Sequence, residues 1–280
     1  MKLFVTGGTG FVGSHFLAQA LAAGHQVTAL RRPGSSPRLR LPAEPDWLDG
    51  PLDGQYDAAL QGIDVFVHLA AHTPNPPYAP LRECLYWNVL AALALASQAQ
   101  AAGVGRFLVA GTCFEYGRAA ERAPRLTTDT PLEPQLSYPT SKAAASVAFQ
   151  GFAREAGLQL KLLRIFQVYG EGEQDHRLWP SLRTAARNGV DFPMSPGGQV
   201  RDFIEVGDVA RQFLRHLDFT DTLPGQPQLR HVASGRPCTV LEFAQHWWRQ
   251  WGARGQLEPG AVPYRPGEIM WLAPDVDRPG

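Results

Sequence analysis

A glycine-rich turn between a strand and a helix, at the start of the chain, constrains the fold more than any other feature. Residues 3–5 are a short β-prone run that leads into Gly8-x-Gly10-x-x-Gly13, which overlaps the spacing Gly7-x-x-Gly10-x-x-Gly13. A helical pattern over residues 14–23 follows. In this context glycines permit a tight turn, close approach of backbone to a pyrophosphate, and close packing of helix on strand. The motif predicts a dinucleotide-binding site at the beginning of the first helix.

The same alternation of strand and helix continues along the first 165 residues. Further β-prone runs lie at residues 26–30, 63–69, 106–110 and 160–165, and helical patterns lie at residues 88–102 and 142–155. This order predicts an α/β fold, a Rossmann-type doubly wound parallel sheet with right-handed crossovers.

Two regions depart from this alternation of strand and helix. Residues 31–55 are rich in Pro, Gly and Arg and predict a loop around one short strand or helix. After residue 166 Pro and Gly become frequent, and residues 240–251 form one clear amphipathic helix with Thr239 as its N-cap. We therefore expect a dinucleotide-binding domain over residues 1–165. Residues 166–280 are expected to be mainly a smaller substrate-binding domain, with some elements returning to the first domain.

Composition excludes several classes of protein. The 26 basic and 26 acidic side chains balance, so no general attraction to nucleic acid or to an anionic membrane is expected. The longest apolar run, residues 89–96, is far shorter than the roughly 20 residues of a membrane span. The three cysteines are widely spaced and form neither a disulfide framework nor a metal-binding pair. We expect a cytoplasmic protein without a metal.

The end of the second predicted strand bears on the choice of cofactor. NAD-binding proteins of this fold usually carry an acid there for the ribose 2′-hydroxyl, whereas this chain has Arg31 and Arg32. A guanidinium pair can bind a 2′-phosphate, so NADP(H) is predicted, with NAD(H) as the alternative. The simpler interpretation is two solvated arginines in an arginine-rich protein.

Tyr138-Pro139-Thr140-Ser141-Lys142 has a spacing that suits acid–base chemistry. Pro139 favours a helix that begins right after the tyrosine, which places Tyr138 and Lys142 one turn apart on one face. A nearby ammonium shifts the pKa of a phenol from about 10 toward the working range. Thr112 follows the predicted strand at 106–110, where ligands bind in such sheets. Its hydroxyl could bond a substrate carbonyl and the phenol together, although threonines in turns more often bond their own backbone.

Several motifs together carry a family resemblance. In chain order these are residues 6–13, His68-Leu69-Ala70-Ala71, the segment from Gly111-Thr112 to Tyr116-Gly117, residues 138–142, residues 163–170 and residues 201–210. The ensemble resembles the extended short-chain dehydrogenases/reductases, and within them the NAD-dependent epimerase/dehydratase branch, which acts on nucleotide sugars. The resemblance covers residues 1 to about 210.

The resemblance implies a role for each matched residue. Thr112, Tyr138 and Lys142 match the catalytic triad, and the first two also contact the substrate. Arg201 matches a position that binds the substrate diphosphate, and Gln167 replaces a common Asn that reaches the nucleotide. Lys142 also holds the nicotinamide ribose. The remaining cofactor-binding positions are Gly7, Gly10, Phe11, Val12 and Gly13 on the pyrophosphate loop, Leu69, Ala70 and Ala71 beside the adenosine, and Phe166.

Departures from the family pattern reduce the number of reactions that the chain is expected to catalyse. Dehydratases of this family place an acidic pair or Ser-Glu directly after the catalytic Thr, but this chain has Cys113 and Phe114 there, followed by Glu115 of unknown direction. Arg31 disfavours the tightly held NAD of epimerases. The residues Arg265-Pro266-Gly267-Glu268 also resemble sugar 4-ketoreductases.

The sequence thus predicts NADPH-dependent reduction of a nucleoside-diphosphate-4-keto-6-deoxysugar at C4. An NAD-dependent nucleotide-sugar 4-epimerase is the alternative, and a non-catalytic dinucleotide-binding protein is a further one. The resemblance also implies a homodimer formed through the helices at 88–102 and 142–155.

Overall fold

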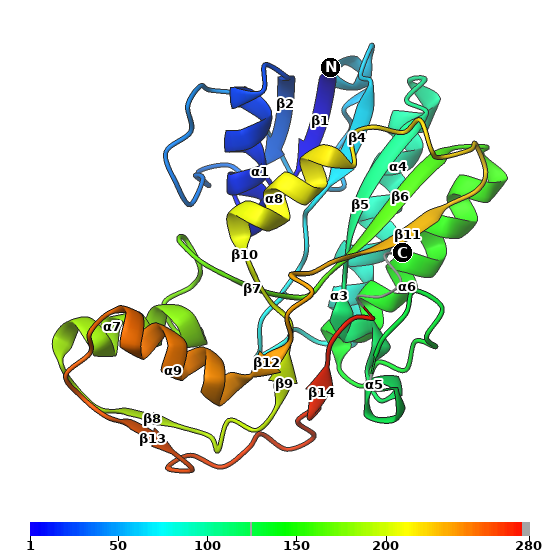
Figure 1. Cartoon of the computed structure of the whole chain (residues 1–280). Helices are drawn as coiled ribbons and strands as arrows, with labels where there is room; N and C mark the ends of the chain where they lie inside the picture. Colours follow the sequence, from blue (N-terminus) through cyan, green and yellow to red (C-terminus); the bar gives the residue numbers. More distant parts are fainter. Residues whose placement is uncertain (124, 276–280) are drawn as a thin grey trace.

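A seven-stranded parallel sheet forms the centre of the protein (Figure 1). The structure is a computed structural model, which describes residues 1–123 and 125–275. All neighbouring strands in the sheet pair in parallel. The carboxyl ends of the strands therefore share one edge, and the predicted doubly wound sheet is confirmed. In spatial order the strands are β11 (Gln228–Val232), β6 (Gln159–Ile165), β5 (Arg106–Thr112), β4 (Val65–His68), β1 (Lys2–Thr6), β2 (Gln26–Arg31) and β3 (Asp46–Asp49).

Helices cover both faces of the sheet because its inner strands are apolar on both sides. On β1 the side chains of Leu3 and Val5 enter one core with α1 (Phe11–Ala22) and α8 (Val206–Arg215). Phe4, between them, enters the opposite core. That opposite layer contains α2 (Asp57–Leu60), α4 (Ala92–Ala101) and α6 (Ser137–Glu155).

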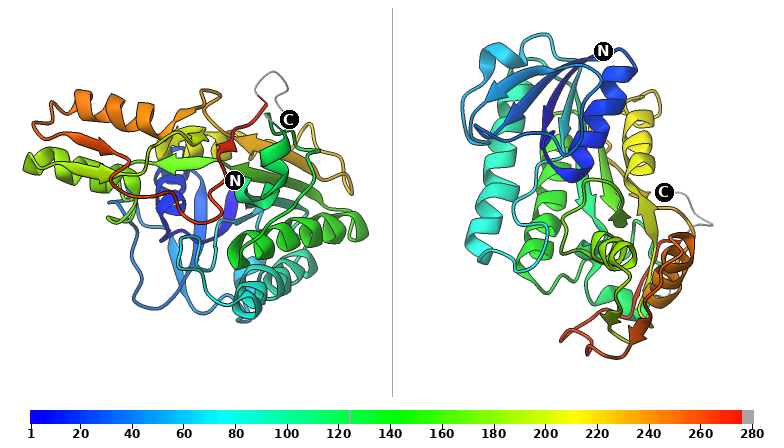
Figure 2. Two further views of the ribbon diagram at one scale, coloured as in Figure 1. Left: turned by 90° about the horizontal axis from the view of Figure 1, so that it is seen from below. Right: turned by 90° about the vertical axis from the view of Figure 1, so that its left-hand side faces the viewer.

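A smaller lobe lies beside the carboxyl edge of the sheet, with α7 (Leu178–Asn188) and α9 (Val240–Gln250) packed together away from the main sheet (Figures 1 and 2). Its apolar cluster includes Leu182, Met194, Ala244 and Trp248. The prediction of an N-cap at Thr239 is confirmed, because its hydroxyl accepts from the Glu242 amide at 3.1 Å. The elements are β7 (Gln167–Tyr169), α7 (Leu178–Asn188), β8 (Phe192–Met194), β9 (Val200–Arg201), β10 (Phe203–Glu205), β12 (Cys238–Thr239), α9 (Val240–Gln250), β13 (Leu257–Pro259) and β14 (Trp271–Leu272).

The second half of the chain also completes the first lobe. The α8 helix packs on the α1 side of the sheet, where Phe213 meets Phe16, and β11 extends the sheet beside β6. The domain boundary at residue 165 stays a prediction. Among the described residues, no helix is long and apolar enough to cross a membrane.

Two helix predictions need correction. The predicted helix at 88–102 is the end of a longer helical stretch, made of α3 (Leu81–Leu85), the π-helical η1 (Tyr86–Ala91) and α4. Within η1 the buried Asn88 side chain accepts from the His72 amide at 2.7 Å and donates to Ser141 Oγ at 2.9 Å. A hydrophobic pattern does not reveal such long-range partners.

The α6 helix begins at Ser137, so the prediction that it begins after Tyr138 is wrong. Ser137 Oγ donates to the Ala79 carbonyl at 2.7 Å, which anchors this start to the loop after β4. Pro139 lies within the first turn, where a missing N–H costs no helical bond.

Candidate active site

The glycine turn packs directly against the segment that follows β4. Gly7 has a φ of +76°, and a Cβ on it would lie 2.5 Å from the Ala70 nitrogen. A Cβ on Gly13 would lie 2.0 Å from the Gly7 carbonyl oxygen. Both positions therefore require glycine, and the turn brings the predicted pyrophosphate loop beside the predicted adenosine-side residues 69–71.

The start of α1 offers free donors to an anion. The helix begins at Phe11, its N-cap Gly10 supplies no side-chain cap, and its first turn holds no acid. Amides in a first helical turn have no intrahelical acceptor, so those of Phe11 and Val12 can bind phosphate oxygens. A Cβ on Gly10 would come near only the Gly7 oxygen, at 3.1 Å, so the backbone is open to close approach. These residues fit a dinucleotide pyrophosphate.

Thr112 ends β5 and begins the short 3₁₀ helix η2 (Cys113–Tyr116). Its hydroxyl accepts from the Phe114 amide at 3.4 Å, and its own amide donates to Glu115 Oε1 at 2.8 Å. Thr112 therefore caps η2, as the backbone-bonding alternative expects. The same hydroxyl also forms a hydrogen bond with the Cys113 side chain.

Tyr138 and Lys142 occupy the first turns of α6, and both side chains are buried. The Tyr138 ring lies 5.5 Å from that of Tyr78, and Lys142 Nζ donates to the Ala110 carbonyl at 2.8 Å. Burial raises the pKa of Tyr138 and lowers that of Lys142. The expectation that Lys142 lowers the Tyr138 pKa is not met here, because burial dominates and the ammonium is bonded to β5. A phenol with a raised pKa is protonated at neutral pH, which is the form that donates a proton.

Glu115 is turned into the core. It is fully buried, and its Oε2 accepts from Ser146 Oγ at 2.7 Å and from Arg164 Nε at 3.0 Å. With the bond from the Thr112 amide, both of its oxygens are used. Glu115 thus ties the end of β5 to α6 and β6, and cannot serve as an acid toward a ligand without breaking these bonds.

Neither of the other two residues after Thr112, Cys113 and Phe114, can act as an acid at neutral pH. Cys113 is buried, and burial raises its thiol pKa to about 12. Phe114 is apolar. The η2 segment therefore presents no available carboxyl group.

Arg31 lies at the carboxyl end of β2 and is held by β3. Its Nε donates to Asp49 Oδ1 at 2.8 Å, and its guanidinium lies 4.6 Å from the centre of the Trp47 ring. Arg32, the next residue, is exposed. The predicted pair of arginines therefore splits into one that is held by a carboxylate and one that extends toward solvent.

The residues predicted to meet the substrate lie where the two lobes join. Arg201 ends β9, is buried, and its Nη2 donates to Glu268 Oε1 at 2.5 Å. Gln167 begins β7 and is half-buried. Phe166 is buried, with its ring 5.1 Å from that of His231, so its side chain belongs to a core cluster.

Comparison with known proteins decides the family. Residues 3–228 match the model of the NAD dependent epimerase/dehydratase family. The chain belongs to this family.

Relatives within the family differ in activity. The chain is 29% identical over 272 residues to a UDP-glucose 4-epimerase of Corynebacterium glutamicum, covering 88% of this chain and 79% of that protein. It is 28% identical over 294 residues to a dTDP-4-dehydro-6-deoxy-D-allose reductase of Streptomyces bikiniensis, covering 96% and 88%. A solved structure of MoeE5 in complex with UDP-glucose and NAD matches with a TM-score of 0.83 at 27% identity, covering 99% of this chain and 90% of that one. Family membership supports an enzyme that acts on nucleotide sugars.

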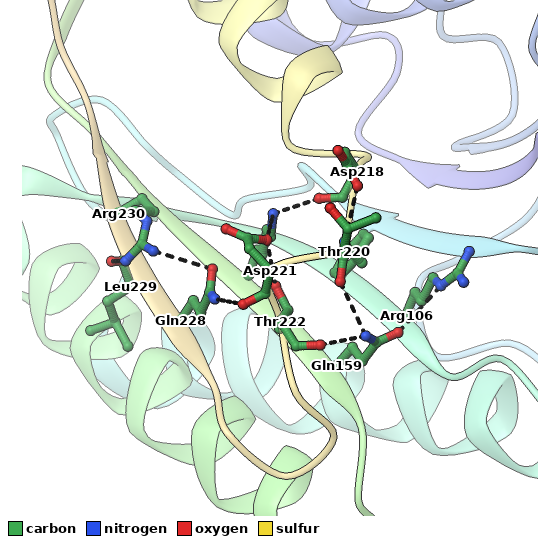
Figure 3. Close-up of polar contacts among 11 residues, drawn as sticks. Arg106, Gln159, Asp218, Thr220, Asp221, Thr222, Gln228, Leu229 and Arg230 are labelled. Carbon is green, nitrogen blue, oxygen red and sulfur yellow. Dashed lines mark hydrogen bonds and ion pairs between the residues drawn. The ribbon is translucent and has the colours of Figure 1, made fainter. Parts of the chain in front are cut away.

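A second polar cluster lies at the opposite, amino edge of the sheet (Figure 3). The buried Lys161 on β6 donates to the Asp218 carbonyl at 2.5 Å and pairs with Asp221 Oδ1 at 2.7 Å. Gln159 donates to the Thr222 carbonyl at 2.5 Å (Figure 3). A cavity of about 500 Å³ adjoins Lys161 and the end of α8. These bonds fasten the loop after α8 to the amino end of β6, at the opposite edge of the sheet from Thr112.

The sequence interpretation missed the partners that hold the predicted residues in place, chiefly Arg164, Glu115 and Asp49. One signal was present for Arg164, because an arginine in an apolar strand needs an anionic partner. The spacing Thr112-x-x-Glu115 is also a capping-box pattern. Nothing in the order of residues indicates that Asp49 faces Arg31.

Proposed function

We propose that this protein reduces a nucleoside-diphosphate-4-keto-6-deoxysugar at C4 with NADPH. The observation that carries the proposal is the η2 segment, where Cys113 is a buried thiol and Glu115 is bonded within the core. Elimination of a C6 hydroxyl needs an acid near the leaving group, and η2 supplies none. The reductase relative from Streptomyces bikiniensis supports a 4-dehydro-6-deoxysugar substrate.

Each predicted catalytic residue has a part in this reaction. The bound dinucleotide supplies hydride. Tyr138, protonated at neutral pH because burial raises its pKa, would donate its proton to the C4 carbonyl oxygen as it becomes an alkoxide. Thr112 stabilises that oxygen as charge develops, when its hydroxyl turns from the Cys113 thiol toward the substrate. Lys142, one turn along α6 from Tyr138, would offset the negative charge that develops as the phenol loses its proton.

The binding positions divide between the lobes. The amides of Phe11 and Val12 would hold the pyrophosphate, and Arg31 would hold the 2′-phosphate of NADPH. Arg201 and Gln167, at the junction with the smaller lobe, would contact the nucleotide sugar. A bidentate guanidinium suits a diphosphate, although Arg201 must then share its fork with Glu268.

A 4-epimerase is the second candidate, and one contact favours it. Arg31 is paired with Asp49, so its charge is partly neutralised, and a carboxylate stands at the carboxyl edge as in NAD-binding proteins. The epimerase relative and the NAD-bound neighbour agree with this alternative.

Cofactor exchange separates the two candidates. A reductase consumes its cofactor in each cycle, whereas an epimerase regenerates it in place. Purified protein should lose bound dinucleotide on dialysis and then consume one NADPH for each product with a 4-keto-6-deoxysugar nucleotide. Retained NAD⁺ together with interconversion of UDP-glucose and UDP-galactose would establish the epimerase. Dinucleotide binding without turnover on a broad panel of nucleotide sugars would favour a non-catalytic protein.

We also infer a homodimer formed through α4, with the adjoining η1, and α6. Leu90 and Val147 on these helices are 61% and 62% exposed, which is unusual for large apolar side chains. Replacing both with Glu should shift the protein from dimer to monomer in sedimentation. A wild-type protein that is already monomeric at micromolar concentration would contradict this inference.

A further inference from the structure

The phenol of Tyr138 is held by packing rather than by a hydrogen bond. Within residues 1–123 and 125–275, no group forms a hydrogen bond with the Tyr138 hydroxyl. The ring is buried, and its aromatic neighbour is Tyr78, at 5.5 Å between ring centres and a tilt of 30°. Aromatic pairs at such a separation attract by about 0.5–1.5 kcal/mol beyond the effect of the area they bury. Contact with the Tyr78 ring can therefore fix the direction in which the phenol points.

Hydrogen bonds tie Tyr78, in the loop after β4, to the helix that carries Tyr138. The carbonyl of Ala79 accepts from Ser137 Oγ at 2.7 Å, so the residue after Tyr78 is bonded to the residue before Tyr138. The Ala79 amide donates to Thr73 Oγ1 at 3.3 Å, which closes the loop on itself. The relative position of the two rings is thus set by a short, bonded path of backbone.

Thr73 begins this closed loop in an unusual backbone conformation. Its φ is +46°, in the left-handed region that a β-branched residue rarely adopts. Such a conformation costs roughly 1–3 kcal/mol and persists only where the surrounding contacts determine it. The Thr73 hydroxyl supplies such contacts through the Ala79 amide and, at 3.4 Å, the Cys84 thiol. The loop is therefore held in one shape, with Tyr78 at its end.

The same loop is connected to the smaller lobe. Asn75 Nδ2 donates to Gln174 Oε1 at 2.8 Å, in the segment between β7 and α7. Burial raises the pKa of Tyr78, whereas the guanidinium groups of Arg177 and Arg265 lower it, so both charges act on its hydroxyl. Tyr78 thus lies between the proposed proton donor on the larger lobe and two cations on the smaller one.

We propose that Tyr78 is a positioning residue, whose ring holds the Tyr138 phenol in the orientation that delivers its proton to the C4 oxygen. The inference rests on the proposed function for the role of Tyr138 as the proton donor. Tyr78 acts through the contact of the two rings and transfers no proton itself. Removal of its ring leaves space into which Tyr138 can turn, and a displaced donor loses rate because proton transfer needs close geometry.

Fluorine NMR tests this role without substrate. Tyr138 is replaced by a ring-fluorinated tyrosine, and spectra of the folded protein are compared among Tyr78 variants. Tyr78→Phe keeps the ring and should leave the line pattern unchanged. In Tyr78→Ala the lines should broaden or increase in number, because the Tyr138 ring then occupies more than one orientation. Tyr86→Ala is the matched control, since it removes a ring packed at 5.0 Å on Trp87, and it should leave the lines as they are.

Steady-state kinetics show whether Tyr78 acts through Tyr138. With NADPH and the ketosugar nucleotide, Tyr78→Ala should lower kcat by about tenfold to a hundredfold, while KM and the dissociation constant of NADPH stay nearly unchanged. Tyr78→Phe should keep most of the wild-type rate. In a Tyr138→Phe background, Tyr78→Ala should cause no further loss, because residues that act as a unit are not additive.

Either measurement can overturn the proposal. Full additivity of the losses from Tyr78→Ala and Tyr138→Phe would show that Tyr78 acts independently of the proton donor. Unchanged fluorine lines in Tyr78→Ala would show that its ring does not hold Tyr138. Wild-type protein that reduces no ketosugar would refute the proposed function instead, and the fluorine spectra would still decide whether Tyr78 orients the phenol.

Discussion

Two ion pairs near the carboxyl edge of the sheet contain the same chemical groups in different surroundings. Arg164 and Glu115 approach to 3.0 Å with side chains only 2% and 0% exposed, whereas Arg31 and Asp49 approach to 2.8 Å with side chains 24% and 50% exposed. Distance therefore does not distinguish them, and burial does. The buried pair has no water to replace a lost partner, whereas the exposed pair can exchange a partner for solvent or ligand.

The two pairs also differ in their additional bonds. Glu115 joins the Thr112 amide, Ser146 and Arg164, so it connects β5, α6 and β6 around the predicted catalytic residues. Within the described part of the chain, the side-chain partners of Arg31 both lie on β3. The buried end of the edge is therefore fixed by three elements, whereas the exposed end is held by one neighbouring strand.

The largest expected effect is at the buried end. Tyr138→Phe removes the proton donor and keeps the ring against Tyr78, so turnover should fall by about 10²–10⁴ while folding and cofactor binding persist. Steady-state kinetics with NADPH and the ketosugar nucleotide measure this loss. Turnover at the wild-type rate would assign the proton donor to another residue.

Glu115→Gln tests how much the buried Arg164–Glu115 pair contributes to the free energy of unfolding. It leaves the Arg164 charge buried without a counter-ion, which should lower the free energy of unfolding by about 3–5 kcal/mol. The matched control is Arg122→Ala, because the Arg122–Glu133 pair has side chains 63% and 36% exposed and should contribute less than about 1 kcal/mol. Urea denaturation measures both, and equal losses would show that burial does not separate the pairs.

Arg31→Asp should leave stability nearly unchanged and alter binding. NADPH affinity should fall by roughly tenfold to a hundredfold, because the 2′-phosphate loses a cation and meets two carboxylates, while NADH affinity is spared. Arg32→Asp, on the exposed neighbour, should have a smaller effect. A wild-type protein that binds NADH more tightly than NADPH would refute the prediction that Arg31 selects NADP(H).

The smallest expected effect is a loss of folding stability at low pH, caused by the buried His68. Burial lowers the pKa of His68 to about 3, below the value near 6.5 in the unfolded chain. Between these values the unfolded chain binds the proton and the folded chain does not, so stability falls as pH drops from 6.5 toward 3. The loss by pH 5 should be about 1–2 kcal/mol, and His68→Gln should flatten the slope. His246→Gln, at an exposed position, is the control and should leave the slope intact.

The order and type of the main elements were predictable because the inner strands are apolar on both faces and glycines mark the turns. The strand predicted at 26–30 is observed as Gln26–Arg31, and the amphipathic helix at 240–251 as Val240–Gln250. Helix boundaries near the site were less predictable. The start of α6 depends on the bond from Ser137 to Ala79, and η1 depends on the partners of Asn88, which are distant in sequence.

For the candidate site, the residue types were predictable but their partners were not. The glycine turn and the Tyr138–Lys142 spacing indicate chemistry through local geometry alone. The inward direction of Glu115 and the pairing of Arg31 with Asp49 depend on which strands are neighbours. Pairing across a parallel sheet joins residues that lie tens of positions apart, so no local pattern records it.

The return of α8 and β11 to the first lobe has a consequence for recombination. Residues 206–232 leave the smaller lobe, complete the first lobe as α8 and β11, and precede β12 and α9, which rejoin the smaller lobe (Figure 1). A single crossover that imports a foreign C-terminal half would also import a foreign edge strand and a foreign partner for α1. Exchange of sugar preference between relatives is therefore expected to need two separate grafts, one on each side of residues 206–232, or point changes in place.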